Sequence, residues 1–209
     1  MRENPFNGFP TSVDVDGQLF PINPSFRVGI SIELEILKEE NPDVVGLLNL
    51  FYPSGIPSNI SAAFDAMLWF FRGEESKEET QGQAKKKGGR VYDFEIDSEA
   101  ILASFLSAYG IDLSKDDLHW WAFRRLLFNL PSETLFMQRI RYRTADISKM
   151  SKEEKKHYKK MRALYAIKDD RRKEVQTVEE RDAALIEKVR KRFEEVKRST
   201  EKTEGEGVK

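Results

Sequence analysis

The chain has 209 residues, of which 39% are hydrophobic and 34% are charged, and its formal net charge is -1. This length allows one domain of ordinary size with appendages, and the small net charge gives no whole-chain indication of a nucleic-acid partner. The absence of cysteine excludes disulfides and thiolate sites, and no run of 18 consecutive apolar residues indicates a membrane span.

The first predicted element is a small β-hairpin over residues 12–22. Val13 and Val15 alternate with polar residues, and Asp16 with Gly17 supplies the turn. We expect residues 1–23 to form an N-terminal arm with this hairpin, and we expect the hairpin to be the only sheet. The first 17 residues lack the basic start and apolar run of a secretory signal.

Three helices are predicted to follow the hairpin. Asn23 is expected to cap the first helix, with Pro24 at its first position, and apolar spacing extends it to about Lys38. The second is expected over residues 42–51. The third is expected over residues 60–72, with an apolar stripe made of Phe64, Met67, Leu68 and Phe71.

Residues 74–90 differ sharply in composition from the segments on either side. They contain no large apolar residue, so burial cannot offset the entropy lost on ordering. The sequence therefore predicts a flexible, exposed loop. Contact of its lysine run with phosphate is an alternative that we regard as less favoured.

Three further helices are predicted between residues 91 and 143. Asp97 and Ser114 occupy N-cap positions, Gly110 occupies a C-cap position, and Ser114 with Asp117 approximates a capping box. The segment also contains paired tryptophans but no recognisable catalytic motif. This combination favours a packing and partner-binding unit.

The C-terminal third is basic and helical in its pattern. Residues 139–198 contain 21 basic and 12 acidic residues, and Ser151 with Glu154 forms a capping box for a helix ending near residue 167. Residues 168–198 are predicted to form a long charged amphipathic helix, and residues 199–209 a disordered tail. The apolar stripe of that long helix includes Leu185, Val189 and Phe193.

The predicted fold is therefore mainly α. We expect a compact multi-helix domain over residues 24–167, with a two-lobed arrangement as the alternative. The small N-terminal β-hairpin precedes this domain, the flexible loop interrupts it, and the long charged C-terminal helix follows it.

The sequence offers little for catalysis or for a metal. His119 and His157 are the only histidines, and neither has the spacing to a carboxylate or second histidine that a metal site needs. No nucleophile elbow or nucleotide-binding glycine loop is present. We therefore expect a protein that is not an enzyme and has no metal or cofactor, with His119 in a structural role.

Trp120 and Trp121 are the strongest candidates for partner contact. Neighbouring residues on a helix point about 100° apart, so we expect one ring in the core and the other partly exposed as an anchor. Burial of both rings is the alternative. Phe128, further along the same helix, is expected to extend this apolar surface.

Two groups of basic residues also call for an interpretation. We expect Arg124 or Arg125 to form a structural ion pair with Asp93, Asp97 or Asp112, in preference to a phosphate clamp. A second group, in which Tyr142 accompanies three arginines, resembles a nucleic-acid patch, but we favour solvated helix edges. Its arginines are Arg139, Arg141 and Arg143.

Four segments together resemble a family of bacteriophage proteins named for a fifteenth gene product, found in long-tailed phages and prophages of Gram-positive bacteria. The resemblance covers about residues 20–167. The segments are FPINPSFRVGISIE, AMLWFFRG, VYDFEIDSEAILASFLSAYGIDL and LHWWAFRRLLFNLPSETLFMQRIRYRTADI, and a basic segment ending in KKMRALYAI follows them.

This resemblance implies a tail assembly chaperone in the bacterial host cytoplasm. Its partner would be the tape-measure protein, with the tail-tube protein, a second tail chaperone and self-association as further expectations, and no catalytic residue is implied. Neither a membrane nor a nucleic acid is an expected partner. The alternatives are a nucleic-acid-binding phage accessory protein that uses the basic third, and a minor structural tail protein.

We expect the partner to bind an apolar groove and the C-terminal stripe. The predicted partner-binding residues are Trp120, Trp121, Arg124, Arg125, Phe128, Leu185, Val189 and Phe193.

Overall fold

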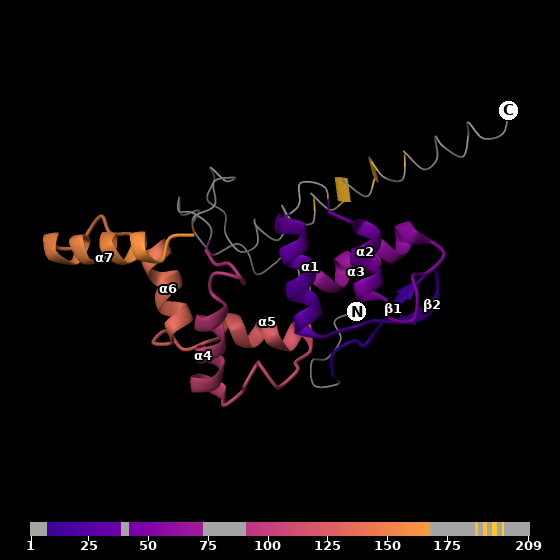
Figure 1. Cartoon of the computed structure of the whole chain (residues 1–209), viewed down its shortest axis with the longest axis horizontal. Coiled ribbons are helices and arrows are strands. Elements are labelled where there is room, and N and C mark those ends of the chain that lie inside the picture. The colour runs from indigo at the N-terminus through magenta and orange to yellow at the C-terminus, as the bar shows by residue number, and fades with distance from the viewer. Residues whose placement is uncertain are drawn as a thin grey trace. The chain divides into compact units, whose positions relative to one another are not determined.

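The structure is a computed structural model that describes residues 8–38, 42–72 and 91–167. It also describes six residues of the C-terminal segment, all helical and exposed: Glu187, Arg190, Lys191, Glu194, Glu195 and Arg198. The predicted loop 74–90, the predicted tail 199–209 and the stripe residues Leu185, Val189 and Phe193 lie outside the described residues. Across the described ranges the fold is mainly α, with seven helices and one small sheet, as the sequence predicts (Figure 1).

The chain divides into two compact units. Among the described residues, the first unit contains 8–38, 42–72, 119–121 and the six C-terminal residues, and the second contains 91–118 and 122–167. The first unit is therefore discontinuous in sequence. Residues 119–121, which lie between the two segments of the second unit, and the six C-terminal residues both belong to it.

The sheet of the first unit is the predicted hairpin. Strand β1 (Ser12–Val15) pairs antiparallel with β2 (Gln18–Pro21), and Val15 lies opposite Gln18. The turn residues Asp16 and Gly17 both have positive φ, 56° and 81°, as a type I′ turn requires. The hairpin prediction is confirmed.

Helix α1 (Phe26–Lys38) begins later than predicted. The side-chain oxygen of Asn23 accepts from the amide of Ser25, and the Ser25 hydroxyl oxygen in turn accepts from the amide of Arg27. Asn23 therefore stabilises the turn that leads into the helix, and Ser25 takes the capping position that the sequence assigned to Asn23. Pro24 lies before the helix rather than in its first turn.

Helices α2 (Val44–Phe51) and α3 (Ile60–Arg72) agree with their predicted ranges within two residues. Helix α3 packs against both β1 and α2. A buried hydrogen bond joins α3 to the end of α2, because the Tyr52 hydroxyl donates to the carbonyl oxygen of Ala63 at 2.7 Å. Burial raises the pKa of Tyr52, so this hydroxyl stays a donor.

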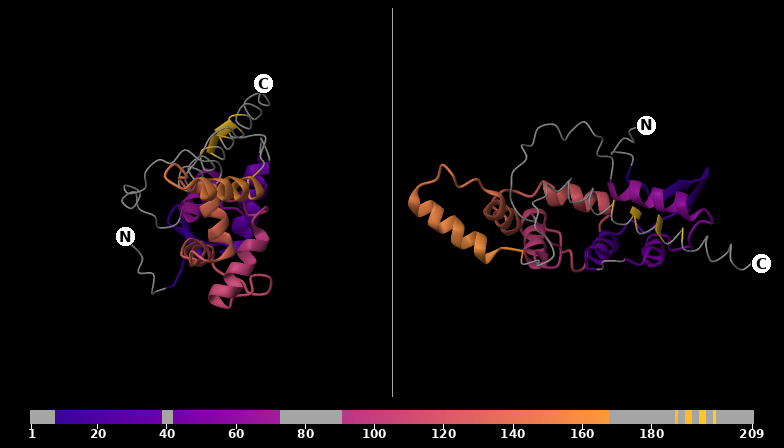
Figure 2. Two further views of the ribbon diagram at one scale, coloured as in Figure 1. Left: turned by 90° about the vertical axis from the view of Figure 1, so that its left-hand side faces the viewer. Right: turned by 90° about the horizontal axis from the view of Figure 1, so that it is seen from above.

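The second unit contains α4 (Ser98–Tyr109), most of α5 (Trp120–Phe128), α6 (Leu135–Thr144) and α7 (Lys152–Leu164), and α6 contacts both α4 and α7 (Figure 2). The three helices predicted between residues 91 and 143 are thus confirmed. Gly110 ends α4 with φ 69°, as the predicted C-cap requires.

The predicted start of α5 at Ser114 is wrong. Residues 113–115 form a turn, and the helix begins only at Trp120. The amide and hydroxyl of Ser114 both donate to the carboxylate of Asp112, so Ser114 serves a local turn and forms no capping box with Asp117. Hydrogen bonds from Lys115 and Ser114 lower the pKa of Asp112 to about 2.

The capping box of α7 is confirmed. The Glu154 amide donates to the Ser151 hydroxyl oxygen at 3.3 Å, and the Ser151 amide donates to the Glu154 carboxylate at 2.8 Å. The helix ends at Leu164, three residues before its predicted end.

Candidate partner-binding surfaces

The paired tryptophans belong to the interior of the first unit. Trp120 is 2% exposed and Trp121 is 5% exposed. The Trp120 ring lies so close to Gly29 that a Cβ atom there would be 2.3 Å from the ring, and Trp121 Nε1 donates to the carbonyl oxygen of Phe70 at 2.7 Å. The expected partly exposed anchor is therefore not found in this pair, and burial of both rings is the alternative that is observed.

His119 has a structural position beside these rings. Its Nε2 lies 2.9 Å from the carbonyl oxygen of Pro10, and its Nδ1 accepts from the amide of Trp121 at 3.1 Å. These two contacts require a neutral ring with the proton on Nε2. Phe9 stacks on the imidazole at 4.9 Å. Within the described ranges no cluster of histidine or carboxylate residues is suited to hold a metal ion.

The exposed tryptophan of the described chain is Trp69 on α3. Its side chain is 46% exposed, and its ring contacts the ring of Trp121 edge-on at 5.6 Å. Trp121 in turn stacks on Phe70 at 5.7 Å with an interplanar angle of 26°. Trp69 is therefore an exposed ring on a packed aromatic base. A large, pre-positioned aromatic side chain of this kind is typical of binding hot spots.

Trp69 is the centre of a surface that we call the α3 surface. Its members recur at helical spacing on the outward side of α3 and are at least partly exposed: Ala62, Asp65, Ala66 and Trp69. Two alanines beside one tryptophan leave room for a second helix to approach closely. Asp65 provides a charged position at the edge.

The sequence contains a signal for this surface that the predictions above do not use. Met67 and Phe71, two members of the predicted apolar stripe, each lie two residues from Trp69. At about 100° per residue, Trp69 must then point away from the stripe by roughly 160°. The paired tryptophans at 120 and 121 drew attention because of their proximity, but the isolated tryptophan has the exposed position.

Arg190 of the C-terminal segment lies at the edge of the α3 surface. One of its guanidinium nitrogens is 3.2 Å from the Asp65 carboxylate, and both side chains are about half exposed or more. An exposed ion pair of this kind contributes about 0–1 kcal/mol. It marks the position of Arg190 within the first unit and does not by itself hold the segment there.

The second unit has an exposed apolar surface on α4, which we call the α4 surface. It consists of Leu102, Ala103 and Leu106, and the two leucines are 40% and 55% exposed. Because the two leucines are four positions apart, both lie on one side of the helix. Helix α4 therefore has apolar residues on its outer side as well as on its buried side.

A charged cluster lies in the interior of the second unit. Asp97, with no exposed surface, accepts two hydrogen bonds from Arg143, at 2.6 and 2.9 Å, and one from Arg139 at 3.2 Å. Arg143 also donates to the carbonyl oxygens of Val91 and Tyr165. We call these three charged side chains the Asp97 cluster. They join the start of α4, helix α6 and the segment that follows α7.

The Asp97 cluster corrects two expectations. Asp97 precedes α4 as predicted, but its side chain caps no helix amide and accepts from the two arginines and from the Asp93 amide instead. Arg143 is 7% exposed, so it belongs neither to a nucleic-acid patch nor to a solvated helix edge. Burial tends to raise the pKa of Asp97, but the hydrogen bonds and charge of Arg143, together with hydrogen bonds from the Asp93 amide and Arg139, outweigh burial and hold this pKa below its usual value.

The other predicted site residues of the second unit do not form an open binding surface. Arg124 is buried, with its guanidinium 5.8 Å from the centre of the Phe128 ring, and Phe128 lies 6.0 Å from the ring of Tyr92. Arg125 is exposed. The arginines that bind Asp97 are Arg139 and Arg143, rather than the predicted pair at 124 and 125.

None of the helices in the described ranges is long and apolar enough to cross a membrane.

Comparison with known proteins identifies one family. No curated protein and no solved structure matches the chain. A family profile described as Bacteriophage Gp15 protein matches residues 7–167. That range covers most of the chain and includes both tryptophan segments. The chain therefore belongs to the bacteriophage Gp15 protein family.

Proposed function

We propose that this phage protein is a non-catalytic tail assembly chaperone, which binds the helical tape-measure protein in the host cytoplasm until the tail tube forms around it. Family membership supports a phage role, and the resemblance noted in the sequence supports tail assembly. The observation that carries the proposal is the half-exposed Trp69 on its packed aromatic base.

The α3 surface suits an amphipathic helical client. A tryptophan side chain has about 150–250 Å² of surface, so covering the exposed half of Trp69 removes about 100 Å² from water. At about 25 cal/mol per Å² this contributes about 2–3 kcal/mol. One such contact is weak. Many copies bound along one long client gain strength from effective concentration.

The α4 surface offers a second apolar contact in the other unit. Leu102 and Leu106 form a ridge on one helix, and such a ridge packs against a client helix by the same ridge-in-groove geometry as in helix pairs. We therefore assign the proposed client site to the α3 and α4 surfaces, which are exposed in the folded chain, rather than to Trp120 and Trp121. Self-association through either surface is an alternative use of the same residues.

Co-expression with the tape-measure protein tests the proposal. We expect the chain to raise the soluble yield of the client and to co-purify with it. Trp69→Ser should weaken client binding about 30-fold or more, which corresponds to about 2 kcal/mol. Leu19→Ser is the matched control, because Leu19 is a more exposed apolar residue of the same unit. Unchanged client solubility, or equal binding by both variants, would contradict the proposal.

The α4 surface has its own matched pair. Leu106→Ser should weaken client binding, whereas Leu164→Ser, at another exposed leucine of the second unit, should not. Mass spectrometry of purified phage particles then separates a chaperone from a structural tail protein. We expect the chain to be absent from the particles, and its presence at fixed copy number would favour the structural role.

A further inference from the structure

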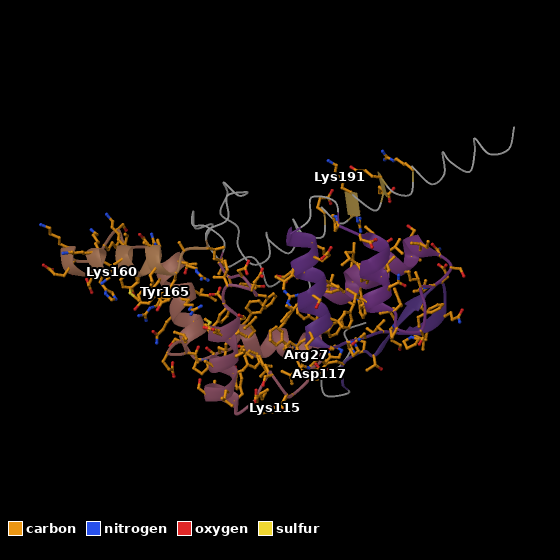
Figure 3. The ribbon with its side chains drawn as sticks, in the orientation of Figure 1. Arg27, Lys115, Asp117, Lys160, Tyr165 and Lys191 are labelled. Carbon is orange, nitrogen blue, oxygen red and sulfur yellow. The ribbon has the colours of Figure 1, made fainter. Side chains whose placement is uncertain are left out.

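Helix α7 gathers five lysines on one face, with Glu153 at the edge of that face. Five lysines fall within a sector of about 140° around the helix axis, at about 100° per residue. They extend over about 12 Å of its length. We call them the lysine face: Lys152, Lys155, Lys156, Lys159 and Lys160. Figure 3 shows Lys160 on this helix.

These lysines lack charge partners in the described part of the chain. None of the five forms an ion pair with another described residue. The neighbouring Glu154 carboxylate is used by the capping box at Ser151. Like charges three and four residues apart on a helix repel one another, so the lysine face lowers the stability of α7. Such a local conflict is expected where a surface serves a ligand.

Other residues of α7 hold the helix in place. Arg162 donates to the carbonyl oxygens of Tyr142 at 3.0 Å and Ala145 at 2.6 Å. The rings of Tyr142 and Tyr158 pack edge to face at 5.2 Å. Arg143 donates to the carbonyl oxygen of Tyr165, which lies just beyond the helix and is labelled in Figure 3. The lysines therefore project from a helix whose orientation within the second unit is fixed.

The composition of the face indicates the chemistry of its ligand. The centres of protein interfaces are depleted in lysine and depend on apolar or aromatic anchors, and the lysine face has none. Phosphate groups along a nucleic-acid strand suit such a face, because each lysine that neutralises a phosphate releases condensed counterions. The face also lacks the arginine, asparagine and glutamine side chains that read base edges.

We propose that the lysine face of α7 binds the phosphate backbone of nucleic acid without reading its sequence. This activity is independent of the α3 surface and of the proposed chaperone role. It also differs from the basic aromatic patch considered in the sequence, because Arg139 and Arg143 of that patch are bound to Asp97.

Fluorescence anisotropy with the full chain tests this. The probes are a labelled 30-nucleotide single strand of mixed sequence and the corresponding duplex, at 50 and 200 mM salt. For about four neutralised phosphates, single-strand binding should weaken about 50-fold between the two salt concentrations. Two probes of different sequence should bind equally well.

The variant Lys155→Gln, Lys156→Gln, Lys159→Gln removes three charges from the face, and glutamine keeps a similar helix propensity. We expect it to weaken binding more than 10-fold and to reduce the salt slope. The control Arg27→Gln, Lys115→Gln, Arg125→Gln removes three exposed charges elsewhere and should bind nearly as the parent does. Circular dichroism checks that both variants fold.

Three results would overturn the proposal. The first is no binding to either probe at 50 mM salt. The second is an equal loss in the two triple variants, which would indicate attraction by diffuse charge. The third is tight, face-dependent binding of poly-glutamate without binding of the oligonucleotides, which would indicate an acidic protein segment as the ligand.

Discussion

The interior of each unit is held together by a different kind of interaction. In the first unit, residues 119–121 contact residues 9–70 through aromatic rings and a few hydrogen bonds between neutral groups. In the second, the Asp97 cluster joins helices through full charges that are largely shielded from solvent. Both connect residues more than 40 positions apart. We therefore expect the stability of the first unit to depend on how its side chains fit together, and the stability of the second to depend on charge and pH.

The two units can be followed separately by their own fluorescence. All three tryptophans, Trp69, Trp120 and Trp121, lie in the first unit. Five of the six tyrosines lie in the second unit, and Tyr52 is the exception. Tryptophan emission therefore reports on the first unit, and hydrogen exchange of α4 amides reports on the second.

The largest expected effect is that of Asp97→Ala. It leaves the buried Arg143 without a carboxylate, which should lower the free energy of unfolding of the second unit by about 3–5 kcal/mol. Urea unfolding followed by hydrogen exchange of α4 measures this. Asp117→Ala, at an exposed aspartate, is the control. A loss below about 1 kcal/mol would mean that the cluster does not hold the second unit together.

The same cluster should make the second unit sensitive to acid. The folded-state pKa of Asp97 is below its unfolded value, so its stabilising effect is present above pH 4 and is lost as the pH falls through the folded pKa. We expect α4 amides to lose protection below pH 4 before tryptophan emission changes. Asp97→Asn should remove this difference between the units. Simultaneous loss of both signals in the parent chain would contradict the comparison.

Gly29→Ala tests whether shape governs the first unit. The new Cβ would meet the Trp120 ring at 2.3 Å, and overpacking of this kind costs about 1–3 kcal/mol. Tryptophan emission during urea unfolding should show an earlier transition. Gly46→Ala is the matched control in another helix, because its Cβ meets only the movable side chain of Asp43. Equal effects of the two substitutions would indicate helix propensity rather than the fit of the ring.

The smallest expected effect is that of Ser151→Ala. Loss of the cap should destabilise α7 by about 1 kcal/mol and leave the first unit unchanged. Hydrogen exchange of the first α7 amides is the measurement, with Ser148→Ala in the preceding turn as the control. Faster exchange in α2 or α3 would show that the units are not independent.

Local signals in the sequence predicted much of the fold. The turn at Asp16 and Gly17, the left-handed Gly110 and the box at Ser151 all depend on residues within four positions of one another, and the structure confirms them. The cap expected at Ser114 failed within the same range, because Asp112 competes for the same amide and hydroxyl.

Partners far apart in the sequence could not be assigned in this way. Asp97 was recognised as a partner for arginine, but the choice of Arg143 over Arg124 depends on how α4 and α6 pack. The candidate site failed for a related reason. A helical period shows that Trp69 leaves the apolar stripe, whereas only tertiary packing shows that both Trp120 and Trp121 are buried.

The discontinuous first unit has a consequence for synthesis. After Arg72 has been added, a ribosome must add roughly fifty more residues before Trp121 exists, which takes about 2–10 s at 5–20 residues per second. Until then the carbonyl oxygen of Phe70 and the rings beside it lack the partner that later covers them. A nascent chain stalled before His119 should therefore be prone to aggregate, whereas a chain that already contains Trp121 can cover these groups of the first unit.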